Sequence, residues 1–175
     1  MTMKIVIADL DGTLLHTWKD GDYTPRPKEH LRAWAILTNQ GGIPLRWSGF
    51  PWAKKYPTLR QALMRVRVGM QVSGARRALM ACYHPKQHRS LVGRMLALIG
   101  MVIPLFPILV PEGIVWISFS AKARKPSPWG LLWLARGLPL EKIVYVGDEE
   151  SDRQLAQNAG VRFRLVRSER SGGTA

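Results

Sequence analysis

The residues of this chain best suited to chemistry follow its first apolar run. Residues 5–8, Ile-Val-Ile-Ala, lead directly into Asp9 and Asp11, and Gly12 comes next. A short, β-branched apolar run that ends at a turn signal is typical of a buried strand, and residues i and i+2 of an extended chain point the same way. Two carboxylates held close together repel each other unless a cation or a shared proton stabilises them. The pattern favours an acidic pair built for a cation, with an ordinary Asp-Gly turn as the alternative.

Polar residues recur where three later apolar stretches end. In chain order they are Thr38 and Asn39, then Lys125, then Asp148 and Asp152. Because parallel strands end at the same edge of a sheet, we expect these groups to meet the two aspartates there. Carboxylates form a hard oxygen site suited to Mg²⁺, whereas a hydroxyl, backbone N–H groups and a lysine suit the oxygens of a phosphate. The combination predicts phosphoryl transfer.

The elements that position these residues alternate along the chain. Apolar runs predict strands at residues 5–8, 33–37, 78–83, 114–119 and 142–146. Between them we expect one or two helical turns at 28–32 and helices at 58–70, 86–99, 129–136 and 151–158, while residues 14–27 form a polar loop. This alternation predicts an α/β fold, a Rossmann-like three-layer sandwich with a central parallel sheet.

The ordered set of motifs resembles the haloacid dehalogenase (HAD) superfamily of Mg²⁺-dependent phosphohydrolases. It consists of Asp-Leu-Asp-Gly-Thr at 9–13, Thr-Asn at 38–39, Lys-Pro at 125–126 and Gly-Asp at 147–148 with Asp152 four residues later. Within the superfamily, Thr-Asn-Gln-Gly-Gly-Ile at 38–43 and Arg-Lys-Pro-Ser-Pro at 124–128 resemble the histidinol-phosphatase and heptose-bisphosphate phosphatase branch. The 3′-phosphatase domain of polynucleotide kinases carries similar elements.

The resemblance implies catalytic roles for the two aspartates of the first motif. Asp9 would be the nucleophile that forms an aspartyl-phosphate, and Asp11 would protonate the leaving oxygen and then activate water. Thr38, the backbone of Asn39 and Lys125 would hold the phosphoryl group. Arg124 would assist Lys125.

The resemblance also implies a Mg²⁺ site. Asp9 and Asp148 would bind the ion together with the main-chain carbonyl of Asp11, and Asp152 would act from behind these ligands or through a water. Taken singly, Lys125 has an alternative as a solvated loop lysine, and Asp152 has one as the start of a helix, where acids are favoured.

The chain departs from the family pattern at the first crossover, after the lysine motif, where Pro-Trp-Gly at 128–130 replaces the usual Pro-Gly-Met, and at the expected zinc loop. Only residues 28–37 separate the proline-rich loop from Thr38, so we expect a short or distorted first crossover in a fold with a small cap or none. The pair of cysteines that relatives carry before Arg-Lys-Pro is missing, and Cys82 with His84 cannot close a tetrahedral site. We therefore predict that no zinc is bound.

The length of 175 residues predicts one domain, which the resemblance implies is HAD-like, at 1–167. Within it, 84–123 could form an insertion or small cap, and we expect a flexible tail at 168–175. A single cysteine indicates a reducing compartment. The first apolar run carries the two aspartates and so does not resemble a signal peptide. We expect a cytoplasmic protein.

Charge and one apolar stretch bear on the partners of the protein. The net charge of +14 favours anionic partners, so nucleic acid stays open beside phosphorylated small molecules. Residues 95–111 are uncharged and contain three prolines. Because prolines break a membrane helix, we expect this stretch to be buried core or a small apolar cap, without stable membrane insertion. The sequence leaves the oligomeric state open.

Three functions remain at this point. The favoured one is a Mg²⁺-dependent phosphomonoesterase for a small phosphorylated metabolite. A nucleic-acid 3′-end phosphatase would use the same chemistry with a basic groove. A binding protein that kept the fold without turnover is the third.

Overall fold

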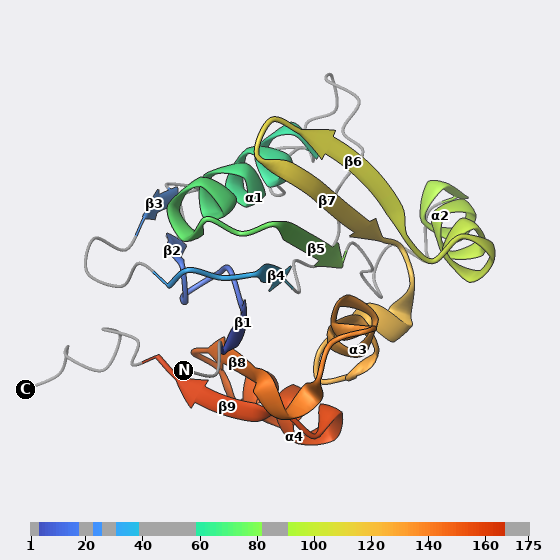
Figure 1. Cartoon of the computed structure of the whole chain (residues 1–175). Coiled ribbons are helices and arrows are strands. Elements are labelled where there is room, and N and C mark those ends of the chain that lie inside the picture. Colours follow the sequence, from blue (N-terminus) through green and yellow to red (C-terminus); the bar gives the residue numbers. More distant parts are fainter. Residues whose placement is uncertain (1–3, 18–22, 26–30, 39–58, 82–90, 167–175) are drawn as a thin grey trace, which may run out of the picture.

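A seven-stranded sheet forms the centre of the computed structural model, which describes residues 4–17, 23–25, 31–38, 59–81 and 91–166 (Figure 1). The strands are β1 (Ile5–Ala8), β4 (Ala35–Thr38), β5 (Arg77–Ala81), β6 (Phe106–Val110), β7 (Gly113–Ser118), β8 (Ile143–Gly147) and β9 (Arg162–Leu165). Their spatial order is β6-β7-β5-β4-β1-β8-β9. Neighbouring strands are parallel, except that β6 runs antiparallel to β7. The predicted α/β class with a central parallel sheet is confirmed.

Helices cover both faces of this sheet, as the alternation of apolar residues along the strands requires. Helix α1 (Leu59–Ser73) packs on the face that carries Ala8 and Val146. Helices α3 (Trp129–Ala135) and α4 (Glu150–Ala159) pack on the opposite face, which carries Ile7 and Tyr145. The three layers are visible in Figure 1.

Strand β1 lies at the centre of the sheet and sets the position of the first motif. Ile7 pairs with Ala35 of β4 on one side and with Tyr145 of β8 on the other. Just beyond the strand, the backbone N–H of Asp9 donates to the carbonyl of Val146 at 2.8 Å. The ends of β1, β4 and β8 therefore meet at one edge.

Most predicted elements are present with small shifts in their bounds, although residues 82–83 of the strand predicted at 78–83 and residues 86–90 of the helix predicted at 86–99 lie outside the described part. Four strands were not predicted. A hairpin of β2 (Leu15–Thr17) and β3 (Tyr23–Pro25) lies in the expected loop at 14–27. Strands β6 and β9 form the two edges of the main sheet. Edge strands have weak sequence signals, because one side of the strand has no partner and even a proline is tolerated there, as in β6.

The first crossover, from β1 to β4, is short as expected. Its described residues contain the β2–β3 hairpin and no helix. Of the helical turns expected at 28–32, residues 28–30 lie outside the described part, and 31–32 are not helical.

Residues 95–111 are buried only in part, with Gly100 and Leu105 inside, and their expected role as a small apolar cap stays a prediction. They form the second half of helix α2 (Leu91–Val102) and strand β6, and their exposed side chains include Met95, Leu98 and Leu109. A connection between two strands places α2 beside the sheet, where nothing in the described chain covers its outer surface. Within the described residues, no helix combines the length and the apolarity that a membrane span requires.

Two 3₁₀ turns complete the described elements, η3 (Ala121–Ala123) and η4 (Leu140–Lys142). The first occupies the basic loop between β7 and α3, and Ser120 caps it by accepting from the backbone N–H of Lys122. This turn directs the chain to Lys125.

Candidate active site

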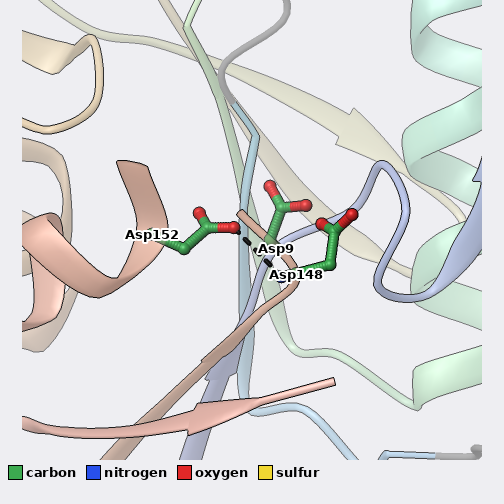
Figure 2. Close-up of side chains that lie close together, drawn as sticks. All are labelled: Asp9, Asp148 and Asp152. Carbon is green, nitrogen blue, oxygen red and sulfur yellow. Dashed lines mark hydrogen bonds between the residues drawn. The ribbon is translucent and has the colours of Figure 1, made fainter. Parts of the chain in front are cut away.

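Three aspartates from separate parts of the chain converge at the carboxyl edge of the sheet. Asp9 follows β1, Asp148 follows β8, and Asp152 lies in the first turn of α4. One carboxylate oxygen of each lies within 4.8 Å of the others, and Figure 2 shows the three side chains side by side. Asp9 and Asp152 are buried, whereas Asp148 is half-buried. Three carboxylates this close require compensating positive charge.

Lys125 supplies part of that charge from within the cluster. Its buried ammonium donates to Oδ1 of Asp9 and, at 2.6 Å, to Oδ1 of Asp152. Burial by itself would lower the pKa of Lys125, but Asp9, Tyr145 and Asp152 raise that pKa well above its ordinary value. The lysine is therefore a fixed cation, and the alternative of a solvated loop lysine is wrong.

Asp152 uses both of its oxygens within the protein. Oδ1 accepts from Lys125 and from the hydroxyl of Tyr145 at 3.2 Å. Oδ2 accepts from the backbone N–H groups of Asp148 and Glu149, each at 3.2 Å, and the second of these bonds is half of a capping box. Asp152 thus lies at the start of the helix, which was the alternative role given for it, and it also accepts a hydrogen bond from Lys125. With both oxygens engaged, it positions the other groups and is poorly placed to bind an ion directly.

The protonation of Asp9 is finely balanced. Burial raises the pKa of Asp9 to about 7, and the nearby Lys125 acts in the opposite direction. The charges of Asp152 and Asp148 add to the rise. Asp9 therefore exchanges its proton near neutral pH, where a bound cation would favour the ionised form.

The turn after β1 makes room for Asp148. Gly12 has a φ of +81°, and a Cβ at this position would overlap the carboxylate of Asp148. The next residue, Thr13, donates its hydroxyl to Oδ1 of Asp148 at 3.2 Å. Burial raises the pKa of Asp148, and the bond from Thr13 opposes that rise. Glycine is needed here for both its backbone conformation and its lack of a side chain.

Asp11 faces a different neighbour. The hydroxyl of buried Thr38 donates to Oδ2 of Asp11 at 3.2 Å, and Asp11 is half-buried beside the aspartate cluster rather than part of it. The second aspartate of the first motif is thereby joined to the end of β4, next to the cluster.

Two further residues were predicted to bind the phosphoryl group, Arg124 and Asn39. Arg124 is exposed at the end of the η3 turn. Asn39 lies outside the described residues, so its predicted role stays a prediction.

The donor set fits Mg²⁺. Asp9 and Asp148 offer hard carboxylate oxygens close to each other. Because Gly12 has no side chain, the Asp148 carboxylate can occupy this position. Among the described residues, the grouping holds no histidine or cysteine that would favour a softer metal. Of the three predicted ligands, Asp11 was expected to bind through its main-chain carbonyl, and that contact stays a prediction.

Two residues of the site were missed in the sequence. Tyr145 lies fully buried beneath the cluster, and its ring is 5.6 Å from the Lys125 ammonium. Thr13 belongs to the first motif, but the motif by itself predicted no role for it. A tyrosine within an otherwise apolar strand, two residues before the Gly147 turn, is the signal that could have revealed the first.

The chain is similar to known proteins over most of its length. The model of the HAD-hydrolase-like family matches residues 122–175, which include Lys125, Asp148 and Asp152. Phosphoglycolate phosphatases from strains of Cereibacter sphaeroides are 28% identical over 194 aligned residues, covering 93% of this chain and 84% of theirs. A crystal structure of a HAD-like protein from Mesorhizobium loti aligns with a TM-score of 0.46 at 15% identity, covering 91% of this chain and 69% of that one.

The family model spans the last two of the four motifs, and the relatives align over 93% of this chain. The chain is thus similar to phosphatases of the HAD superfamily. Its place in the histidinol-phosphatase and heptose-bisphosphate phosphatase branch stays a prediction.

Proposed function

We propose that the protein is a Mg²⁺-dependent phosphomonoesterase that acts through an aspartyl-phosphate at Asp9, with a small phosphorylated metabolite as substrate. The observation that carries the proposal is the position of the Asp9 carboxylate, held by Lys125 and adjoining Asp148 at the carboxyl edge of the sheet. A nucleophile next to a fixed cation and a cation site is the arrangement that phosphoryl transfer needs.

In the first step, a carboxylate oxygen of Asp9 forms a bond to phosphorus while the bond from phosphorus to the ester oxygen breaks. Asp11 gives its proton to the departing oxygen, so the product leaves as an alcohol. Lys125 offsets the charge on the nucleophile, and Thr38 holds Asp11 in reach through their hydrogen bond.

In the second step, water attacks the phosphorus of the aspartyl-phosphate and gives a proton to Asp11. The bond between phosphorus and the Asp9 oxygen breaks, phosphate leaves, and both aspartates return to their starting states. Mg²⁺ held by Asp9 and Asp148 would supply neutralising charge for the phosphoryl oxygens.

The size of the substrate is supported by the relatives. Those that match over most of their length are phosphoglycolate phosphatases, which makes 2-phosphoglycolate the first compound to assay. A nucleic-acid 3′-end phosphatase is the second candidate because of the +14 charge. The single cysteine in the sequence supports a cytoplasmic location for either.

The test is Mg²⁺-dependent release of phosphate from 2-phosphoglycolate, sugar phosphates, nucleotides and 3′-phosphorylated oligonucleotides. We expect turnover that chelation abolishes and that Asp9→Asn removes. The matched control is Glu150→Gln, the same chemical change at an exposed position of α4, which should retain full activity. A preference for the oligonucleotide, with an affinity that falls steeply with salt, would favour the second candidate.

The intermediate is tested separately. Acid quenching during turnover should leave phosphate bound to the protein, and peptide mapping should locate it on Asp9. Undiminished turnover in Asp9→Asn would exclude the aspartyl-phosphate. If no substrate turned over and the folded protein bound neither Mg²⁺ nor a phosphate-mimicking metal fluoride, the non-catalytic function would replace the proposal.

A further inference from the structure

Helix α2 presents an apolar stripe to solvent. Leu91, Met95, Leu98 and Val102 follow one another at intervals of four, three and four residues, which places them on one side of the helix. Leu91 is 76% exposed, Leu98 58% and Val102 81%. A stripe of this kind normally faces a protein core. Exposed apolar patches of several large side chains mark interaction surfaces.

The stripe lies in the most basic part of the chain. Residues 30–140 contain 16 lysines and arginines but one acidic residue, Glu112, and that residue is paired with Arg67 at 2.8 Å. Arg94 is an exposed residue of α2 itself. All the other acidic residues of the chain lie before or after this stretch.

Further basic residues adjoin α2 from the loop after β7. A Cβ added to Gly100 would lie 2.6 Å from the carbonyl oxygen of Phe119, so the helix is in close contact with the chain there. Lys122 and Arg124 are exposed a few residues farther along this loop. Gly100 lies on the side of α2 opposite the stripe, so this loop contacts the helix from behind, whereas Arg94 lies on the helix itself next to the stripe.

We propose that the exposed stripe of α2 docks the protein on an anionic lipid surface. Apolar side chains at the stripe would enter the interface between headgroups and acyl chains, while Arg94 would contact the anionic headgroups and the net charge of +14 would add a longer-range attraction. Nucleic acid would satisfy the positive charge but leave the apolar stripe in water. A second copy would cover the stripe but bring two strongly basic regions together.

Docking in this way would bring the candidate active site near the lipid surface. Figure 1 shows α2 beyond the carboxyl end of β7, and this is the edge of the sheet at which the aspartate cluster and Lys125 lie. The docking itself does not rest on the proposed phosphatase function, because it is measured by binding alone.

The test is co-sedimentation of the full chain with vesicles of phosphatidylcholine alone and with vesicles that also contain about a third phosphatidylglycerol. We expect binding to the anionic vesicles, weaker as salt increases. Leu98→Glu should lower the partition coefficient at least about tenfold, because it replaces a buried apolar contact by a charge. The matched control is Leu165→Glu on β9 at the far edge of the sheet, a leucine that is 49% exposed, and it should bind as the parent does.

Several outcomes would overturn the proposal. Equal binding to both kinds of vesicle, or to neither, would do so. Equal loss in the Leu98→Glu and Leu165→Glu variants would mean that the effect is one of charge alone. Sedimentation equilibrium that shows self-association of the parent, lost in Leu98→Glu, without vesicle binding, would assign the stripe to a second copy. Circular dichroism of each variant establishes that it is folded.

Discussion

Lys125 links the charges of the candidate site. It joins Asp9 and Asp152, two carboxylates that arrive from opposite ends of the sequence, and it lies over the ring of Tyr145. An ion pair in a buried position contributes little net stability, but the loss of one partner leaves the other charges uncompensated. The consequences of removing this lysine should therefore be larger than those of removing an ordinary surface charge.

We expect Lys125→Met to lower activity by at least about a hundredfold, because the variant removes a fixed cation from the phosphoryl-transfer site. We also expect a loss of about 3 kcal/mol in the free energy of unfolding. Steady-state kinetics and urea denaturation measure the two effects. Lys122→Met, at an exposed position three residues away, is the control and should change neither. Similar kinetics and stability in both variants would contradict this role for Lys125.

The pKa of Asp9 predicts how stability depends on pH when Mg²⁺ is removed. Because this pKa is raised from 3.8 to about 7, the folded protein holds a proton that the unfolded chain has released. The resulting stability is fully present below pH 3.8 and is lost as the pH rises through about 7, by on the order of 4 kcal/mol. Asp9→Asn cannot titrate at this position. The stability of the parent relative to this variant should therefore fall between pH 5 and 8, and a constant difference would refute the prediction.

The same pKa predicts the pH dependence of Mg²⁺ binding. An ion that binds the ionised Asp9 must displace its proton, so the affinity should rise up to about tenfold per pH unit below pH 7 and level off above it. Isothermal titration calorimetry at pH 6 and pH 8, in buffers of different ionisation enthalpy, measures both the affinity and the protons released. Binding without proton release at pH 6 would indicate that Asp9 is not a ligand.

At the scale of elements, the tight turn after β1 brings three parts of the chain together. Its Gly12 contacts Asp148, its Thr13 donates to the same carboxylate, and the N–H of Gly12 donates to the carbonyl of Leu15 at 2.8 Å. The turn after β8 is equally close-fitting, because a Cβ at Gly147 would overlap the carboxylate of Asp152. Both turns depend on glycines that the sequence places next to an aspartate.

We expect Gly12→Ala to abolish Mg²⁺ binding and activity, because the new methyl group would displace the Asp148 carboxylate. Gly160→Ala is the control, since Gly160 has a φ of +69° as the C-cap of α4 but nothing within 4 Å of an added Cβ. Both variants should lose about 1 kcal/mol or more of stability from backbone strain. Calorimetric Mg²⁺ titration of the two folded variants separates strain from steric displacement. Normal binding by Gly12→Ala would exclude the displacement.

At the scale of the whole molecule, the net charge of +14 opposes the compact state through self-repulsion. Salt screens this repulsion, and a change of 1 kcal/mol in a domain of this size shifts Tm by roughly 2–4 °C. Raising NaCl from about 0.02 M to about 0.3 M should therefore raise Tm by a few degrees. Differential scanning calorimetry at several salt concentrations measures the shift, and a falling Tm would show that attractive ion pairs outweigh the repulsion.

The sequence by itself determined the central strands and the order of the four motifs. Short apolar runs such as residues 5–8 and 143–146, the first followed by Asp-Leu-Asp-Gly and the second by Gly-Asp, are local signals that need no knowledge of the rest of the chain. Parallel strands then bring the ends of those runs to one edge, so the meeting of Asp9, Thr38, Lys125 and Asp148 could be predicted.

Only the tertiary structure decided how these residues are paired and what stays exposed. Lys125 and Asp9, which form an ion pair, are 116 positions apart in the sequence. The hydrogen bond from Tyr145 to Asp152 depends on how α4 packs against β8. The exposure of α2 likewise depends on which surfaces the other elements leave uncovered. Periodicity identifies the apolar side of an element, but burial is a property of the assembled molecule, because it requires a partner surface that the local sequence does not specify.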